Sequence, residues 1–317
     1  MRFGEEDNPD PAFHPCKGLL QTCCSLISDI PIIPEIQKAS GCGYRNDEGV
    51  GFRITDNHDN EAQFGEFPWA VAVLKEEMIE TGVGNVYQCG GSLIHPQVVL
   101  TAAHCVHSKP ANLLKIRAGE WDTQTTDEIF PHQDRDVTEV IIHEAYYKGG
   151  LHNDVALLIL TTPVELVENV NTACLPPQGF NFDGARCFAS GWGKNLWSKE
   201  GKYQVILKKI DLPIIPYAPC LEALRKTRLG GRFKLHESFI CAGGEKGKDT
   251  CKGDGGSPLV CPIPNGNHDQ YYQAGIVAWG IGCGDVNPGV YVNVQMFRHW
   301  IDQQFDYKQL DKSYYIA

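Results

Sequence analysis

The sequence predicts an all-β protein, folded as a barrel or a sandwich, with one helix near its carboxyl end. From residue 65 onward, short apolar runs alternate with turns of glycine, proline and polar residues, which is typical of many short strands. The exception is Val294 to Phe305, where Val294, Phe297 and Ile301 recur at helical spacing. The clearest strand-like runs are residues 69–74, 98–101, 156–160 and 274–279.

Length and charge limit the classes of function. The chain has 317 residues, enough for one large domain with an additional amino-terminal piece. Its 39 acidic and 28 basic residues give a formal net charge of −11, which argues against nucleic acid and against an anionic membrane surface as partners. No apolar run reaches the roughly 18 residues of a membrane span. Basic proteins or cationic ligands are better candidates.

The cysteine content indicates an oxidising compartment. Thirteen cysteines are present, and the cytosol would keep most of them reduced. The first residues nevertheless lack the apolar core of a secretory signal peptide. We therefore expect that Met1 is not the natural start and that a signal peptide lies upstream.

Three short motifs carry the functional signal. They are Thr-Ala-Ala-His-Cys at residues 101–105, Asn-Asp-Val-Ala-Leu-Leu at residues 153–158 and Gly-Asp-Gly-Gly-Ser-Pro at residues 253–258. They resemble the histidine, aspartate and nucleophile motifs of trypsin-like serine proteases, in the chain order of that family. The resemblance runs from about Arg53 to Trp300 and implies a chymotrypsin-like double β-barrel with a C-terminal helix.

The nucleophile motif departs from the family at one position. The family reads Gly-Asp-Ser-Gly-Gly-Pro, and its serine corresponds to Gly255. By the resemblance, His104 would accept the serine proton, Asp154 would hold the histidine tautomer and the Gly253 N–H would line the oxyanion hole. A glycine has no oxygen with which to attack a carbonyl, and loss of such a residue costs roughly 10⁶-fold in turnover. We therefore expect a pseudo-protease and not an enzyme.

Ser257 is the alternative nucleophile. It lies two residues downstream of Gly255, so its Cα is displaced by about 6 to 7 Å if the chain is extended. A nucleophile and its base must lie within roughly 3.2 Å of each other. Residual trypsin-like proteolysis through Ser257 is therefore the minor hypothesis.

Activation in this family follows cleavage after a basic residue. The new amino terminus, normally Ile-Val-Gly-Gly, inserts and pairs with the aspartate before the nucleophile. Arg53, Ile54 and Asp254 occupy the corresponding positions, but residues 55–57 are Thr, Asp and Asn. The alternative is that Arg53 is a solvated linker residue and that local donors satisfy Asp254.

The resemblance also implies a specificity pocket. Asp249 lies where trypsin-like members place the carboxylate that pairs with Arg or Lys, and Gly280 and Gly289 match the small residues of the pocket wall. A basic side chain could be held there as a substrate-binding remnant. The alternative is a relic kept for packing or blocked by a neighbouring loop.

A calcium loop is a further hypothesis. Glu120 and Asp127, together with Asp122 and Glu128, resemble the oxygen-rich loop that binds Ca²⁺ in trypsin. Phe130 stands where the family places another acid. An ordinary acidic surface loop is the alternative, and we expect no other cofactor to be required.

The cysteine positions indicate the domain organisation of the chain. Cys16, Cys23 and Cys24 resemble the closing half of an arthropod clip domain, so we expect a partial disulfide-rich clip domain at residues 1–24. A linker tethered by Cys42 would follow at residues 25–53, then the protease homologue domain at residues 54–306 and a tail at residues 307–317. By the resemblance, the disulfides are Cys42–Cys174, Cys89–Cys105, Cys187–Cys261, Cys220–Cys241 and Cys251–Cys283.

The combination resembles the clip-domain serine protease homologues of arthropods, which include masquerade-like proteins and prophenoloxidase-activating cofactors. That resemblance implies a secreted binding scaffold in haemolymph, bringing an active clip-domain protease together with prophenoloxidase during melanisation, an innate immune response. Self-association into a homo-oligomer is compatible with it. The alternative is an adhesive or decoy protein whose inactive cleft captures basic peptides.

Overall fold

The computed structural model describes residues 41–317 except 52, 54–59, 80–81, 127, 195–202, 247–253, 265, 267–268 and 283–285. The predictions of a partial clip domain at residues 1–24 and of a linker over residues 25–40 lie outside the described residues.

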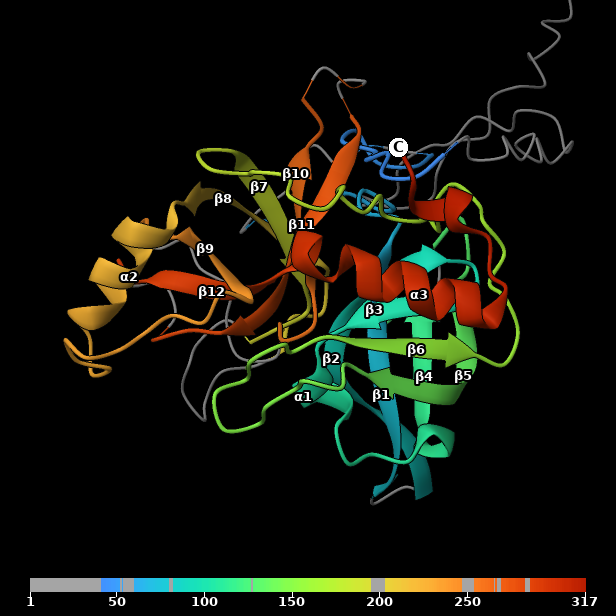
Figure 1. Cartoon of the computed structure of the whole chain (residues 1–317). Helices are drawn as coiled ribbons and strands as arrows, with labels where there is room; N and C mark the ends of the chain where they lie inside the picture. The colour runs from blue at the N-terminus through green and yellow to red at the C-terminus, as the bar shows by residue number, and fades with distance from the viewer. Residues whose placement is uncertain are drawn as a thin grey trace, which may run out of the picture. The chain divides into compact units, whose positions relative to one another are not determined.

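The first half of the described chain forms a closed antiparallel barrel (Figure 1). The strand order is β1-β2-β3-β6-β5-β4, and pairing of β4 with β1 closes it. In β4 the side chains of Leu114, Ile116 and Ala118 alternate inward, as the period of a half-buried strand requires. The strands are β1 (Ala70–Ile79), β2 (Gly82–His95), β3 (Val98–Thr101), β4 (Leu114–Ala118), β5 (Gln133–Ile142) and β6 (Ala156–Leu160).

A second closed barrel follows in the order β10-β11-β12-β9-β8-β7. Pairing of β10 with β7 closes it. The prediction of an all-β double barrel is therefore confirmed. The strands are β7 (Arg186–Gly191), β8 (Lys208–Ile215), β9 (Phe239–Gly243), β10 (Pro258–Pro262), β11 (Tyr271–Trp279) and β12 (Pro288–Asn293).

Short helices lie outside the barrels. Figure 1 places α2 at the outer end of the second barrel and α3 beside the first. Among the described residues, no helix is long and apolar enough to cross a membrane. The helical segments are α1 (Ala103–Val106), η1 (Ala111–Leu113), α2 (Tyr217–Arg225), η2 (Val294–Phe297), α3 (Arg298–Lys308) and η3 (Lys312–Tyr315).

The C-terminal helix is confirmed, with different bounds. Residues 294–297 form a 3₁₀ turn, and the α-helix begins only at Arg298. Residues 307–317 pack as part of the domain, although the sequence sets them apart as a tail. The Tyr315 side chain is fully buried edge-on against Phe305, and its carbonyl accepts the Leu175 N–H at 2.9 Å.

Four disulfides link the described residues. They are four of the five pairs that the family resemblance implies: Cys42–Cys174, Cys89–Cys105, Cys187–Cys261 and Cys220–Cys241. Cys42–Cys174 ties the segment that precedes the first barrel to the domain. The fifth pair, Cys251 and Cys283, lies outside the described residues.

Candidate functional site

The remnant of a catalytic pair lies in the first barrel. His104 belongs to α1, directly after β3, and Asp154 precedes β6, so pairing of β3 with β6 brings the two segments together. The His104 Nδ1 is 2.7 Å from Asp154 Oδ2, and the His104 backbone N–H donates to Asp154 Oδ1 at 2.7 Å. A carboxylate only accepts, so Nδ1 is the donor in this pair, and Nε2 lies 3.6 Å from the Cys105 Sγ.

The backbone around Asp154 is unusual. Asp154 is fully buried, whereas the His104 side chain keeps 27% of its surface exposed. Leu151 and Asn153 both have φ of 52°, in the left-handed region that non-glycine residues rarely adopt. Two contacts hold Asn153 there, because its N–H donates to Ser238 Oγ at 3.1 Å and its side-chain amide donates to the Ala145 carbonyl at 2.9 Å. No local pattern in the sequence indicates this role of Ser238.

The gap at Gly255 is filled by the histidine. A Cβ atom at Gly255 would lie 2.7 Å from His104 Nε2 and 3.2 Å from its Cε1, and real Cβ contacts essentially never fall below 3.0 Å. The φ of Gly255 lies outside the left-handed region, so the local backbone does not itself demand glycine. The site therefore lacks both the nucleophilic oxygen and the space in which a serine side chain would begin.

Ser257 lies away from this space. Ser257 is only 1% exposed. It packs so tightly against Gly90 of β2 that a Cβ atom added to Gly90 would lie 2.0 Å from Ser257 Oγ. The hydroxyl forms a hydrogen bond with the Tyr87 phenol. A substrate carbonyl has no access to an oxygen buried in this way, which disfavours the rescue hypothesis.

Asp254 has local partners. The Gly193 N–H donates to Asp254 Oδ1 at 2.9 Å, and a Cβ on Gly193 would lie 2.3 Å from the carboxylate. Burial, together with the charge of Asp254, raises the pKa of the Tyr87 phenol well above its usual value. Gly193 is thus one local donor to Asp254, of the kind that the alternative requires. Residues 54–59, the potential inserting segment, lie outside the described residues.

Arg53 has the exposure expected of a solvated linker residue, the alternative to an activation site. Its side chain is 62% exposed and pairs at 2.5 Å with the equally exposed Glu48. Exposed pairs of this kind contribute little to stability. Arg53 is thus a solvated residue in this structure, accessible from solvent.

The specificity pocket is described only in part. Asp249 and the oxyanion residue Gly253 lie outside the described residues. Gly289 is buried in β12 opposite Ala242, whereas Gly280 follows β11, and a Cβ there would be in ordinary van der Waals contact with the Gly282 carbonyl oxygen at 3.7 Å. Ligand binding in this pocket stays a prediction.

The expected calcium loop already contains a cation. Glu120 accepts from the Arg117 guanidinium and from the Trp121 N–H, each at 3.0 Å, and His132 Nδ1 lies 3.5 Å away. Burial raises the pKa of Glu120, and the hydrogen bond from Arg117 opposes this effect. Asp127 lies outside the described residues. Calcium at Glu120 therefore stays a prediction and would require Arg117 to move.

A second arrangement of metal-ligand atoms is explained by a disulfide. In the described part of the chain, Cys89, His104 and Cys105 bring such atoms within 4.8 Å of one another. Cys89 and Cys105 are joined to each other, and a disulfide offers no thiolate to a metal. This cluster is not a metal centre.

The fold and the site together define a serine protease scaffold whose histidine and aspartate remain and whose nucleophile is absent. The chain belongs to the trypsin family, whose profile matches residues 57–301. It is 56% identical over 296 residues to phenoloxidase-activating factor 2 of Galleria mellonella, covering 91% of this chain and 96% of that protein.

Other relatives are named as inactive. The chain is 40% identical over 318 residues to the inactive CLIP domain-containing serine protease A28 of Anopheles gambiae, covering 96% of this chain and 82% of that protein. It is 39% identical over 307 residues to A8 of the same mosquito, covering 95% and 80% respectively. This chain is accordingly a clip-domain serine protease homologue without proteolytic activity. Its disulfides are of the kind that persist outside the cytosol.

Proposed function

We propose that this chain is a non-catalytic cofactor that brings prophenoloxidase and an active clip-domain protease together in haemolymph. In this role it would promote melanisation by binding and would cleave nothing itself. A homo-oligomer is compatible with the role, because several copies would present several binding surfaces at once.

One observation carries the proposal. The double barrel and the His104–Asp154 pair are retained, while the position of the nucleophile is occupied by a glycine against which the imidazole packs. Relatives named as a phenoloxidase-activating factor and as inactive CLIP proteases support the binding role and the choice of cascade. The fold alone would not assign a function.

Reconstitution of the cascade tests the proposal. Purified prophenoloxidase and its activating protease are mixed with increasing amounts of this chain, and phenoloxidase output is followed by oxidation of a catechol substrate. Output should rise with the concentration of the chain and then saturate. Output that does not depend on the chain would contradict the cofactor role.

A histidine variant separates binding from catalysis. His104→Ala should support the same phenoloxidase output as the unmodified chain, because no proton transfer through His104 is needed. Loss of the effect in a folded His104→Ala chain would instead point to residual catalysis. Retention of matrix proteins rather than cascade proteins in a pull-down would favour the adhesive alternative.

A further inference from the structure

A strongly basic segment stands out in this acidic chain. Residues 223–236 contain no Asp or Glu, although acids outnumber basic residues 39 to 28 overall. We call residues 225–234 the basic turn. It begins at the end of α2, at the outer edge of the second barrel (Figure 1). Its basic residues are all exposed and are Arg225, Lys226, Arg228, Arg232 and Lys234.

The basic turn has a fixed conformation. The Arg225 Nε donates to the Phe233 carbonyl at 2.9 Å, and the Gly230 N–H donates to the Thr227 carbonyl at 3.1 Å. The Phe233 ring packs edge-on against Trp279, with centroids 6.1 Å apart. A surface held in place in this way loses little conformational entropy when a partner binds.

Helix termination explains only part of this charge. Arg225 and Lys226 lie at the carboxyl end of α2, where cations are favourable, and Lys226 pairs with Glu222 at 2.8 Å. Arg228, Arg232 and Lys234 have no such role, and no carboxylate in the described part of the chain lies within ion-pair distance of them. Three cations are thus presented to solvent without an ion-pair partner among the described residues.

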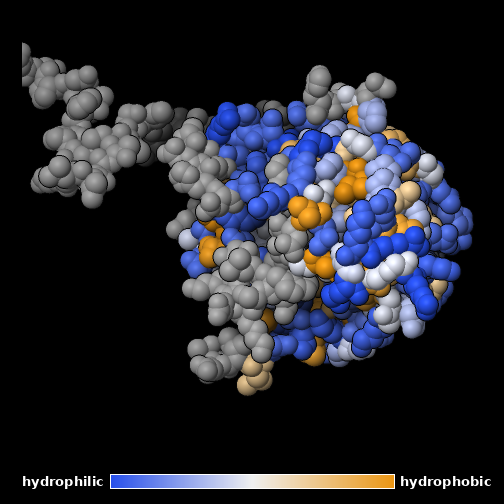
Figure 2. All heavy atoms as spheres, turned by 90° about the vertical axis from the view of Figure 1, so that its left-hand side faces the viewer, coloured by the Kyte–Doolittle hydropathy of each residue, from blue (hydrophilic) through white to orange (hydrophobic). Residues whose placement is uncertain are grey.

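A groove adjoins the basic turn. It has a volume of about 780 Å³, and Lys234 contributes to its lining. Figure 2 looks onto this side of the molecule, where the visible surface is mostly hydrophilic with scattered apolar residues. The groove itself is more apolar, because buried side chains form its floor and partly buried ones its walls. These residues are Phe180, Phe182, Ile214, Leu235, Phe239 and Ile240.

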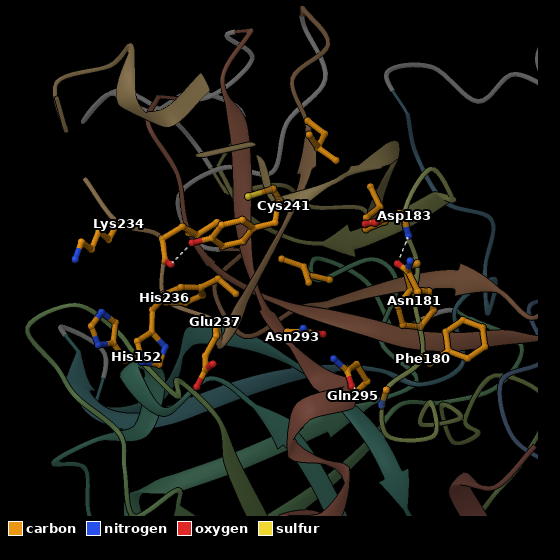
Figure 3. Close-up of a pocket in the computed structure, with 18 residues that line it drawn as sticks. His152, Phe180, Asn181, Asp183, Lys234, His236, Glu237, Cys241, Asn293 and Gln295 are labelled. Atoms are coloured by element: carbon orange, nitrogen blue, oxygen red, sulfur yellow. Dashed lines mark hydrogen bonds between the residues drawn. The ribbon is translucent and has the colours of Figure 1, made fainter. Parts of the chain in front are cut away.

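The two ends of the groove differ in chemistry. Figure 3 shows Lys234 near His152 and His236 at one end, and Asp183 near Phe180 at the other. The two imidazoles stack with centroids 4.1 Å apart, which fixes that end of the groove. Glu237 also lines it. Because Figure 3 places Glu237 beside His236, an anionic ligand group is favoured at Lys234 itself and on the basic turn, outside the groove, and an uncharged apolar group is favoured toward Phe180.

We propose that the groove and the basic turn together bind an acidic peptide segment of a protein partner, with its carboxylates on Arg228, Arg232 and Lys234 and an apolar side chain in the groove. Arg is suited to this role, because its planar guanidinium matches a carboxylate. The proposal rests on the proposed function in that the chain acts by binding. It places this binding surface on the second barrel, apart from His104.

The apolar floor favours a peptide over other polyanions. A sulfated polysaccharide or an anionic membrane surface would use the cations and would gain nothing from a groove lined by phenylalanine and isoleucine. The net charge of −11 also opposes close approach to an extended anionic surface.

Fluorescence anisotropy with labelled peptides tests the proposal. The first probe carries glutamates followed by two leucines, and in the second probe serines replace the leucines. Both are titrated with the full chain at about 50 mM and about 300 mM sodium chloride. The leucine peptide should bind, should weaken at the higher salt concentration and should bind roughly tenfold more tightly than the serine peptide.

Two matched variants locate the site. Arg228→Ala/Arg232→Ala should weaken binding of the leucine peptide by roughly tenfold. The control Arg53→Ala/Lys115→Ala removes the same charge from surface positions before the first barrel and in β4, and it should change binding by less than about twofold. Equal losses in both variants would reduce the effect to net charge and overturn the proposal.

The remaining outcomes are equally decisive. Absence of binding, equal binding of the serine peptide, or tighter binding of heparin fragments or phosphatidylserine vesicles would overturn the peptide site. Peptide binding without any cascade effect would sink the proposed function and leave this site standing. A cascade effect without peptide binding would do the reverse.

Discussion

Restoring the missing serine should fail, for a reason that the glycine alone does not reveal. In Gly255→Ser the new Cβ would lie 2.7 Å from His104 Nε2, so either the loop or the imidazole must move by about 0.3 Å merely to reach the shortest contact seen in proteins. The ring cannot shift freely, because Asp154 holds its Nδ1 at 2.7 Å. The serine hydroxyl then needs further room of its own.

The expected cost is that of an overpacked site. Such substitutions destabilise by about 1–3 kcal/mol. In a domain of this size each kcal/mol lowers the melting temperature by about 2–4 °C, so we expect a fall of about 2 to 12 °C. Differential scanning calorimetry should give a clear fall for Gly255→Ala, since the crowding begins at Cβ, and a fall at least as large for Gly255→Ser, which also has to place its hydroxyl.

Two further readouts complete this test. In a His104→Ala background, Gly255→Ser should cost much less stability than it does in the unmodified chain, because the crowding atoms are then gone and the two substitutions are coupled. A fluorophosphonate probe should leave Gly255→Ser largely unlabelled. An unchanged melting temperature together with stoichiometric labelling and cleavage after arginine would refute the packing argument.

Three other predictions follow from described contacts. Asp154→Ala should lower the free energy of unfolding by about 3 kcal/mol, because the two hydrogen bonds from His104 to the buried carboxylate are then lost. Urea denaturation measures this loss, and a value below about 0.5 kcal/mol would be inconsistent with the pairing. Burial lowers the pKa values of His95, His143 and His152 below 6.5, so the unfolded chain takes up protons at a higher pH than the folded chain does. The free energy of unfolding should therefore fall as the pH drops from about 7.5 to 5. A rise over that range would contradict the burial of these rings. Calcium binding at Glu120 requires the Arg117 guanidinium to leave, so Arg117→Ala should increase the affinity for calcium in isothermal titration calorimetry. If calcium produces no heat of binding with either the unmodified chain or Arg117→Ala, the calcium hypothesis is wrong.

Much of the fold was predictable because strand signals are local. The apolar runs at residues 98–101 and 156–160 coincide with β3 and β6. The run at residues 69–74 falls short of β1, which extends to Ile79 through Lys75, Glu76 and Glu77. Those polar residues are held in the strand by pairing with β2, and a strand formed by pairing leaves no apolar pattern to detect.

The candidate site, too, was predictable only where its signal is local in the sequence. His104, Asp154 and Gly255 could be named because each lies within a short motif. The closure of the imidazole over Gly255 could not, since it depends on a contact between residues far apart in the chain. The buried contact of Tyr87 with Ser257 and the support of Asn153 by Ser238 are also long-range and give no local pattern. The hydrogen bond from the Leu175 N–H to the Tyr315 carbonyl, which holds the end of the chain against the domain, is hidden for the same reason.

Intact-mass spectrometry after exposure to an excess of a fluorophosphonate tests the central claim most directly, namely that the scaffold carries no usable nucleophile. The mass of the unmodified chain should stay unchanged, because position 255 offers no side-chain hydroxyl and Ser257 is buried against Gly90. A stoichiometric adduct on Ser257, or on any other residue of the cleft, would contradict it.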